Sequence, residues 1–414
     1  MINFQAKYFA LSSKKARIKN NLIESHLSLR TYNSINEIDK QFWNSLSNDV
    51  FNSWDFILSL EKARVEDSQM KYLIFSNNKD PVGIAVLSSF FVSLDLLSGV
   101  FISKICSKIR KLSPGFMKVR FLFCGTPISI GKNNLKIIDE SFKDYILDML
   151  VSEMTVIAKE NKITILCLKE FNKSESESLG CLTYKNFIKA PSIPYVKLNI
   201  DRTWNSFPGY MKSMRYNYRR QINKSLKKLA LDNSSSASVE LIDGNNEPKL
   251  IIKIPDVNDA AIFYKLYLEV MKRAKNRMEI LNKDFFENIF SSMNNNCNLV
   301  SLVYKENVLG SALIFKHGDV MTFLLVGLDY SKNKEYDTYF NIVYRIISLA
   351  IEKKCKVLEM GQTSYYLKGR CGGYYEEMYF FIKSLNKPLN FLLSIFKPLL
   401  FPKIHLDELH VFHS

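Results

Sequence analysis

The sequence predicts an α/β (α+β) fold in which two tandem domains each hold a mixed, mostly antiparallel sheet flanked by helices. Three observations support this prediction. The 414 residues exceed what one ordinary hydrophobic core supports. Each half repeats one order of elements, which is helix, antiparallel strands, helix and a further strand. Short polar turns join neighbouring strands, which favours antiparallel pairing over an all-parallel βαβ sheet.

In the first half, residues 28–60 are expected to be helical. Two strands then follow, joined by a polar turn at 77–80. The next expected elements are a strong strand ending before Gly125, an amphipathic helix and another strand. The predicted ranges are 70–75 and 81–89 for the strand pair, 119–124, 137–161 and 163–168. A strand at 195–198 is expected to close this domain, which is assigned residues 1–200.

The second half is expected to begin with a long helix at 207–231, a polar loop at 233–238 and a strand at 239–242. Helices follow at 260–273 and 283–294, and three strands at 299–304, 308–317 and 320–327. The last predicted elements are a helix at 339–353 and strands at 357–360 and 377–382. The second domain is assigned residues 201–384, and residues 385–414 form an apolar tail that contains proline.

The composition is that of a folded protein with a basic surface. Hydrophobic residues make up 47% of the chain, charged residues 24%, and the net charge is +16. Such a charge suits nucleic acid, anionic lipid, an acidic carrier protein or a polyphosphate cofactor, although a Lys-rich composition alone also explains it. The seven cysteines include Cys124 and Cys167 in apolar runs and form no CxxC pair, which indicates buried free thiols. The five histidines do not cluster with other ligands, so no metal site is expected.

Residues 1–17 lack an apolar core of signal-peptide length, so a cytoplasmic protein is expected. Two apolar stretches, 82–106 and 391–401, are interrupted by Asp95 and by Pro398. Both are interpreted as core or as surface contact with a bilayer. Basic residues follow the first stretch, which leaves peripheral membrane contact open: Lys104, Lys108, Arg110 and Lys111.

The stretch 202–228 carries many basic residues and no acidic one. Its apolar residues recur every three or four positions and predict one buried helical stripe. They are Met211, Met214, Tyr218, Ile222, Leu226 and Leu229. The basic residues then crowd the opposite face, where they can hold a polyanion or simply be solvated.

Two further segments carry chemistry. The hairpin at 309–330 has Gly327 near the end of its second strand, and glycine there marks a bulge or a close backbone approach. A bulged strand offers unpaired N–H groups that can stabilise an oxyanion; an ordinary strand end is the alternative. The segment 360–373 is glycine-rich, follows a strand and contains Lys368 and Arg370, which suits an anionic ligand. A flexible surface loop is the alternative there. Neither GxxxxGK[ST] nor GxGxxG occurs.

These segments resemble the BioF-like, Fem-type branch of the GNAT superfamily over about residues 200–384. The resemblance rests on the basic helix 213–228, Gly310-Ser311-Ala312, Gly327-Leu328-Asp329-Tyr330, 339–344, and Gly361-Gln362 with the Lys368-x-Arg370-x-Gly372 segment. In the first half, residues 121–129 are similar, more loosely, to a segment of FemAB-like peptidoglycan biosynthesis/recognition proteins.

The resemblance implies two tandem GNAT folds and transfer of an acyl or aminoacyl group to an amine. It places Arg215, Arg219 and Arg220 along a donor channel and Lys368 and Arg370 at donor or acceptor phosphates. Asp329 and Tyr330 would lie near the reacting amine. The remaining matched positions are assigned to donor binding: Gly327, Thr338, Gly361, Gln362 and Gly372.

The chain departs from a typical GNAT at residues 331–338, where a glycine-containing loop would hold the CoA pyrophosphate. The donor is therefore left open between acyl-CoA, acyl carrier protein and aminoacyl-tRNA, each as a co-substrate with no tightly bound cofactor. The acceptor is an amine on a small molecule, a lipid or a peptidoglycan precursor.

The expected mechanism is direct attack of a primary amine on the activated carbonyl, which requires a base. Asp329 is the first candidate and Glu359 the second, and Tyr330 can protonate the leaving group. Cys371 beside Arg370 is a weaker candidate nucleophile, because no histidine stands at a suggestive position. The rival class is a non-catalytic GNAT-fold protein that binds RNA or an anionic membrane through the basic helix.

Overall fold

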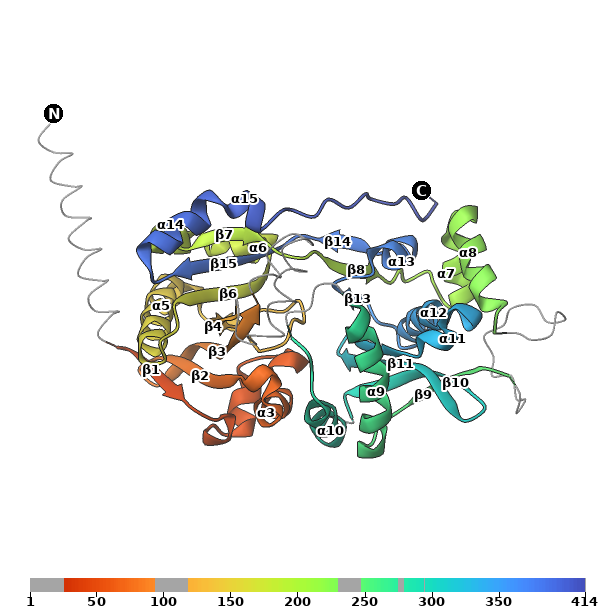
Figure 1. Ribbon diagram of the computed structural model, residues 1–414, viewed down its shortest axis with the longest axis horizontal. Helices are drawn as coiled ribbons and strands as arrows, with labels where there is room; N and C mark the ends of the chain where they lie inside the picture. The colour runs from red at the N-terminus through yellow and green to blue at the C-terminus, as the bar shows by residue number, and fades with distance from the viewer. Residues whose placement is uncertain (1–25, 94–117, 230–246, 275–278, 294, 414) are drawn as a thin grey trace, which may run out of the picture.

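The computed structural model describes residues 26–93, 118–229, 247–274, 279–293 and 295–413. Two sheets lie beside each other along the long axis of the molecule (Figure 1). The expected loop at 233–238, the expected strand at 239–242, residues 1–17 and Lys104, Lys108, Arg110 and Lys111 lie outside the described residues. Within the described part, no helix combines the length and apolarity needed to cross a bilayer.

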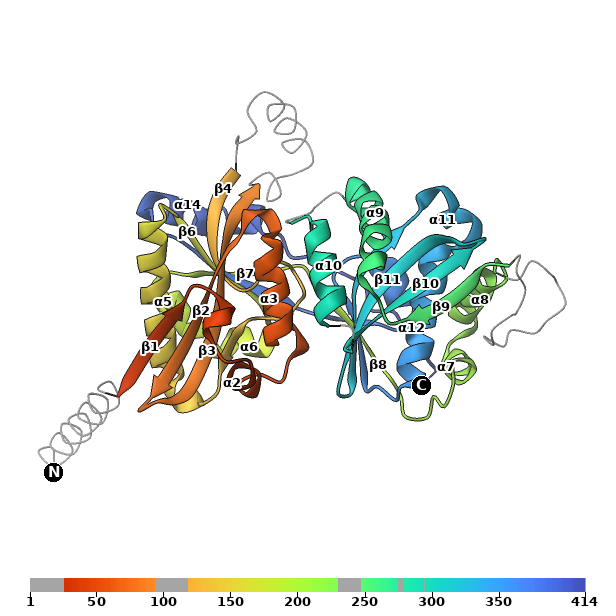
Figure 2. The same cartoon turned by 90° about the horizontal axis from the view of Figure 1, so that it is seen from below.

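The first sheet has the strand order β1-β2-β3-β4-β6-β15-β7, with β5 paired to β3. Apolar side chains on one face pack against α5 (Lys143–Glu160), and those on the other face pack against α3 (Trp54–Ala63) and the chain end. Two short helices, α2 (Lys40–Ser45) and α6 (Lys173–Ser178), lie at its margins (Figure 2). Its strands are β1 (Leu27–Tyr32), β2 (Gln69–Asn77), β3 (Asp80–Ser93), β4 (Lys118–Cys124), β5 (Leu135–Ile137), β6 (Ile165–Asn172), β7 (Ile188–Pro191) and β15 (Met378–Ser384).

The second sheet has the order β14-β8-β13-β12-β11-β10-β9. Its strands are β8 (Tyr195–Asn199), β9 (Lys249–Lys253), β10 (Cys297–Tyr304), β11 (Asn307–His317), β12 (Val320–Leu328), β13 (Val357–Gly361) and β14 (Tyr374–Glu376). The helices of this half are α7 (Phe207–Ser213), α8 (Tyr216–Leu226), α9 (Val257–Arg273), α10 (Lys283–Ser292), α11 (Tyr330–Tyr336), α12 (Thr338–Glu352) and α13 (Tyr365–Arg370). Two further helices, α14 (Lys387–Ile395) and α15 (Lys397–Leu400), follow β15.

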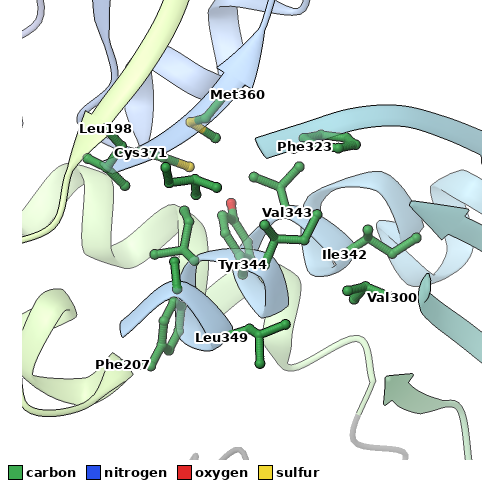
Figure 3. Packing of buried hydrophobic residues seen from close by; sticks show 14 of the residues in the cluster. Leu198, Phe207, Val300, Phe323, Ile342, Val343, Tyr344, Leu349, Met360 and Cys371 are labelled. Atoms are coloured by element: carbon green, nitrogen blue, oxygen red, sulfur yellow. The ribbon is translucent and has the colours of Figure 1, made fainter. Parts of the chain in front are cut away.

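Helix α12 fills the centre of the second core. Figure 3 shows Val343 and Tyr344 of this helix below Met360 and Cys371, and all four are buried in one cluster. The opposite face of this sheet shares a second cluster with the first half, in which Phe51 and Phe56 contact Phe315. The two halves therefore join through a common apolar core as well as through the chain.

Each half repeats one arrangement, as the sequence predicts. In each half, a meander of three antiparallel strands is followed by a long helix. The strand after this helix pairs in parallel with the last strand of the meander. In the first half β6 pairs with β4, and in the second half β13 pairs with β12. The other pairings in the described residues are antiparallel. The mixed, mostly antiparallel fold class is confirmed.

The ends of the halves are exchanged, which sequence order did not predict. Strand β8, expected to close the first half, pairs with β13 and β14 in the second sheet. Strand β15, expected as the last strand of the second half, lies between β6 and β7 in the first sheet. Residues 192–194 and Glu377 make the two crossings, and the Ser192 N–H donates to the Met378 carbonyl over 2.7 Å. The crossings therefore run side by side.

Two helix predictions need correction. Residues 28–60 begin with strand β1 and not with a helix. The first residues of β1 alternate between half-buried and exposed positions, and the strand pairs with β2 in an antiparallel ladder. The predicted helix at 207–231 is broken between α7 and α8. Met214 forms a bridge with Phe412, and the Arg215 N–H donates to the Val411 carbonyl, so tertiary pairing holds this point extended. The predicted apolar stripe is confirmed: Met211, Met214 and Ile222 are buried, and Tyr218, Leu226 and Leu229 pack against the same core.

Gly327 marks a close approach of helix α9 to strand β12. A Cβ at this position would lie 2.6 Å from Leu266 Cβ and 2.7 Å from the Tyr267 backbone nitrogen. Backbone atoms cannot move aside as a flexible side chain can, so only glycine fits without shifting the helix. The β-bulge itself lies nearby, where the pairing of β11 with β12 skips Leu324.

We expect Gly327→Ala to lower the free energy of unfolding by about 1–3 kcal/mol, because the added methyl group pushes α9 away from β12. Chemical denaturation monitored by circular dichroism measures the change. Gly180→Ala is the matched control, since a Cβ there meets nothing within 4 Å. Equal effects of the two substitutions would contradict the close approach.

Candidate active site

Strands β12 and β13 diverge in the middle of the second sheet. They pair only where Val320–Thr322 meets Val357–Glu359, while β12 continues to Leu328 along β11. Beyond Thr322, among the described residues, β12 has no strand partner on its β13 side. The wedge between these strands therefore presents backbone N–H and C=O groups that no ladder uses, and such groups need a partner when they are covered. We call this opening the β12–β13 wedge.

Lys368 lies buried beside the apex of the wedge. Its side chain extends from α13, and its Nζ donates to the Gln362 carbonyl over 3.2 Å and stands 5.7 Å from the centre of the Phe323 ring. Only 3% of the residue is exposed, and none of the ion pairs among the described residues includes it. Burial lowers the pKa of Lys368 to about 7.

A cleft of about 520 Å³ opens on the face of the second sheet that looks toward the first. Its walls come from both halves, including residues 47–52, residues 131–137, β6 and β11–β13. Carboxylates outnumber ammonium groups there. The acidic residues are Asp49, Glu140, Glu170, Glu175, Glu359 and Glu376, and the basic residues are Lys132, Lys136 and Lys197, together with His317. The cleft is thus acidic within a chain of net charge +16.

Glu359 extends from β13 into this cleft at the last paired position before the wedge. Its carboxylate accepts from Lys132 Nζ at 2.6 Å and from Thr322 Oγ1 at 2.9 Å. Although burial by itself lowers the pKa of Lys132, the Glu359 and Asp49 carboxylates outweigh it and hold that pKa above its ordinary value. Lys132 comes from the first half and Glu359 from the second, so this ion pair spans the cleft.

Glu170 is a second buried carboxylate of the cleft wall and is not among the residues that the sequence motifs indicate. It stands in β6 with a φ of 67°, is 4% exposed, and accepts from the Gly131 N–H at 2.9 Å. Its Oε2 has no hydrogen-bond partner among the described residues, and burial raises the pKa of Glu170. The signal that would have found it is a charged Lys169-Glu170 pair inside the apolar run of a strand.

The other predicted catalytic residues stand elsewhere. Asp329 caps α11, where its Oδ1 accepts from the backbone N–H and the hydroxyl of Ser331. The Tyr330 ring lies 3.9 Å from the Arg273 guanidinium, and burial raises the pKa of its hydroxyl. Neither residue lines the cleft. Of the three candidates, only Glu359 does.

The predicted donor-binding residues fall into two groups. One group surrounds the segment after β13, where Gly361 has a φ of 75° and Gln362 Nε2 donates to the Ile193 carbonyl. Arg370 belongs to this group, with its guanidinium 5.0 Å from the Tyr218 ring of α8 and 5.4 Å from Tyr366. Gly372, with a φ of 84°, packs against Phe412. Part of the expected loop forms helix α13, so the alternative of a flexible surface loop is wrong.

The second group stands on or near α8 and α12. Arg215 and Arg220 are exposed, while Arg219 Nη1 donates to the Met214 carbonyl. Thr338 is buried at the start of α12, and its methyl group lies 2.7 Å from where a Cβ on Gly310 would stand. A typical GNAT would have its pyrophosphate-binding loop at residues 331–338. This chain instead has helix α11 there, followed by Asp337 in the left-handed conformation.

Cys371 is unsuited to act as a nucleophile. It is 1% exposed, and burial raises the pKa of its thiol to about 12, so the thiolate is scarce at neutral pH. The same holds for Cys124 and Cys167, which are buried free thiols as the sequence predicts.

Two sheets of this kind, each with one parallel strand pair next to a meander, define the tandem GNAT class of α/β proteins. The crystal structure of FemX is 13% identical and superposes with a TM-score of 0.54, covering 88% of this chain and 100% of that one. A tandem GNAT protein from the clavulanic acid biosynthesis pathway is 9% identical with a TM-score of 0.50, covering 86% and 98%. At these identities the likeness establishes the fold alone.

The family follows from the sequence. Residues 121–372, more than half of the chain, match the FemAB-like family model, described as peptidoglycan biosynthesis/recognition. The chain belongs to this family. A curated relative, "Putative 8-amino-7-oxononanoate synthase 2" of Mycobacterium tuberculosis (strain CDC 1551 / Oshkosh), is 21% identical over 326 residues, which are 77% of this chain. The match spans 40% of that relative's own length.

We expect Lys368→Met to stabilise the protein at pH 6 and to lose this advantage toward pH 10. The folded-state pKa of Lys368 lies below its unfolded value, so the unfolded chain binds more protons between about pH 7 and 10.5 and wild-type stability rises there. The pH-dependent part of the difference is on the order of 5 kcal/mol. Denaturant titrations at several pH values measure it.

Lys224→Met is the control for this experiment, because Lys224 is exposed and its ammonium group stays in contact with water in the folded protein. Because Lys224→Met removes no buried charge, it should lack the pH-dependent difference that burial of Lys368 produces. A flat difference for Lys368→Met as well would show that the buried amine titrates normally.

Proposed function

We propose that this protein is an acyltransferase that moves an acyl or aminoacyl group from an activated donor to a primary amine. The donor is held at the β12–β13 wedge and the amine in the acidic cleft. The proposal rests on one observation: the wedge and the acidic cleft meet at the β12–β13 strand pair. Thr322 and Glu359 form the last rung of the β12–β13 ladder, and both side chains line the cleft. A carbonyl bound in the wedge then lies within reach of an amine bound at Glu359.

The wedge suits the acyl carbonyl because its β12 edge offers backbone N–H groups with no strand partner. Such groups are preorganised donors for the oxyanion that forms when the carbonyl is attacked. Lys368 supports this role from the other face of the sheet, beside Phe323. With a pKa of about 7, it carries a proton in a large fraction of molecules at neutral pH and adds positive charge next to the developing anion.

The cleft suits an amine because its carboxylates hold an ammonium group before reaction. Reaction requires that the nitrogen lose a proton, and Glu359 is the base that we propose. The nitrogen then bonds to the acyl carbon, and the C–S or C–O bond to the donor breaks. The leaving group takes a proton from water, or from Tyr330 if the donor extends to α11. Because Glu359 already holds the first proton, the second proton of the nitrogen is released to solvent. No covalent enzyme intermediate is required.

The donor is proposed as acyl-CoA, acyl carrier protein or aminoacyl-tRNA, all of which are polyanions. Exposed basic side chains favour a large anionic donor: Arg220 and Lys224 of α8, and Arg215 at the N-cap of this helix. The acidic cleft favours an acceptor whose reacting end is cationic, whether on a small molecule, a lipid or a peptidoglycan precursor.

The same basic surface also favours the second candidate function, a non-catalytic protein that binds RNA or anionic membrane. The two functions differ in a direct assay. A binder shows affinity that falls steeply with salt and consumes no donor, whereas a transferase releases free thiol or deacylated tRNA only when an amine is supplied.

We expect one donor class to raise the melting temperature in a titration with acetyl-CoA, long-chain acyl-CoA, acyl carrier protein and aminoacyl-tRNA. A ligand at about a hundred times its dissociation constant adds roughly 2.7 kcal/mol to the folded state. The shift should shrink in the basic-helix variant Arg220→Ala, because every donor in the series is a polyanion. No shift with any donor would argue against the transferase function.

Glu359→Gln should lower turnover on a confirmed amine by roughly a hundredfold or more, because the amide cannot take up a proton. Its oxygen can still accept from Lys132 and its NH2 group can donate to Thr322 Oγ1, although the ion pair with Lys132 is lost. Asp329→Asn is the matched control. Asparagine caps helices as well as aspartate does, so turnover should stay near that of wild type. The reverse pattern, with Asp329→Asn inactive and Glu359→Gln active, would assign the base to Asp329.

A further inference from the structure

Helices α14 and α15 present apolar side chains to solvent. Leu399 is 74% exposed, Phe391 67% and Ile395 54%, and Leu389, Leu392 and Phe396 are also exposed. These residues recur at intervals of three or four, so they share one outward side of the helix pair. A surface helix of a globular protein normally turns such a stripe toward the core. In α14, Leu393 alone is buried.

The helix pair is fixed in this orientation by contacts on its inner side. Asn390 Oδ1 accepts from the Ser384 N–H at 2.8 Å, and its Nδ2 donates to the Asn186 carbonyl at 3.1 Å. Just beyond α15, Phe401 is buried against Phe380 of β15, with ring centres 5.0 Å apart. The outward stripe therefore cannot rotate inward without breaking these contacts.

The charged residues of this segment are of one sign. Residues 385–406 contain Lys387, Lys397 and Lys403 and no acidic residue. Lys403 pairs with Glu377, while Lys387 is exposed at the first turn of α14 and Lys397 begins α15. Figure 1 shows α14 and α15 at an outer edge of the molecule, above β7 and β15. An apolar stripe bordered by lysines matches the surface of an anionic bilayer, where acyl chains lie below phosphate groups.

We propose that the α14–α15 face docks on the surface of an anionic bilayer. Phe391, Ile395 and Leu399 enter the boundary between headgroups and acyl chains, and Lys387 and Lys397 remain at the phosphate level. This contact is independent of the donor wedge and the cleft. It would bring an enzyme without a spanning helix in its described residues to substrates that reside at a membrane.

The test is cosedimentation of the full chain with vesicles of phosphatidylcholine that contain phosphatidylglycerol, compared with vesicles of phosphatidylcholine alone. We expect binding to the anionic vesicles that weakens with added salt. The double variant Phe391→Ser/Leu399→Ser should bind roughly tenfold or more weakly, since it removes two large apolar groups from the contact. Lys387→Glu should weaken binding to anionic vesicles as well.

Ile262→Ser is the matched control, because Ile262 is 49% exposed on α9 in the other half of the protein. It should bind like wild type, and thermal unfolding should confirm that each variant is folded. Absence of wild-type binding, or equal binding by the double variant, would overturn the proposal. So would a wild-type dimer that the double variant loses in analytical ultracentrifugation without any vesicle binding, because the occupant of the face would then be a second copy.

Discussion

The exchange of strands between the two halves is the constraint on which the rest of this structure depends. Strand β8 enters the second sheet and β15 returns to the first, so neither sheet is complete without chain from beyond its own half. The Ser192–Met378 hydrogen bond joins the two crossings. Separating the halves would expose the edges of β6, β7 and β13, and unpaired strand edges are costly. Each half therefore depends on the other for a complete sheet.

This constraint creates the cleft and fixes what lines it. Lys197, Glu376 and Met378 stand near the crossings and line the cleft. Lys132 of the first half, from the loop after β4, lines it as well. Glu359 of the second half accepts from Lys132, which is partly exposed and keeps its charge. A pair of this type costs desolvation and adds little stability by itself. Its position at the last rung before the β12–β13 wedge fits the proposed role of Glu359 as the base.

The distribution of charge separates two kinds of ligand. The net charge of +16 is carried on outer surfaces such as α8, while the cleft between the sheets is rich in carboxylates. On the proposed function, a polyanionic donor and a cationic amine would be attracted to different places, with the wedge between them. The backbone of Glu170 is strained, because a residue other than glycine at positive φ persists only where the surrounding structure holds it. Its carboxylate accepts from the Gly131 N–H and lines the cleft, so the strained residue is part of the cleft wall.

The sequence by itself determined the fold class, the repeated order of elements and the apolar stripe of the basic helix, because these depend on local periodicity. It also singled out Lys368, Glu359 and the glycine-rich segment after β13. It could not determine that β8 and β15 are exchanged, since strand pairing depends on contacts far apart in sequence. For the same reason, only the tertiary structure ranked Glu359 above Asp329 by position and brought Glu170 to the cleft. The close approach of α9 at Gly327, where a bulge was the other expectation, was likewise decided by packing between distant elements.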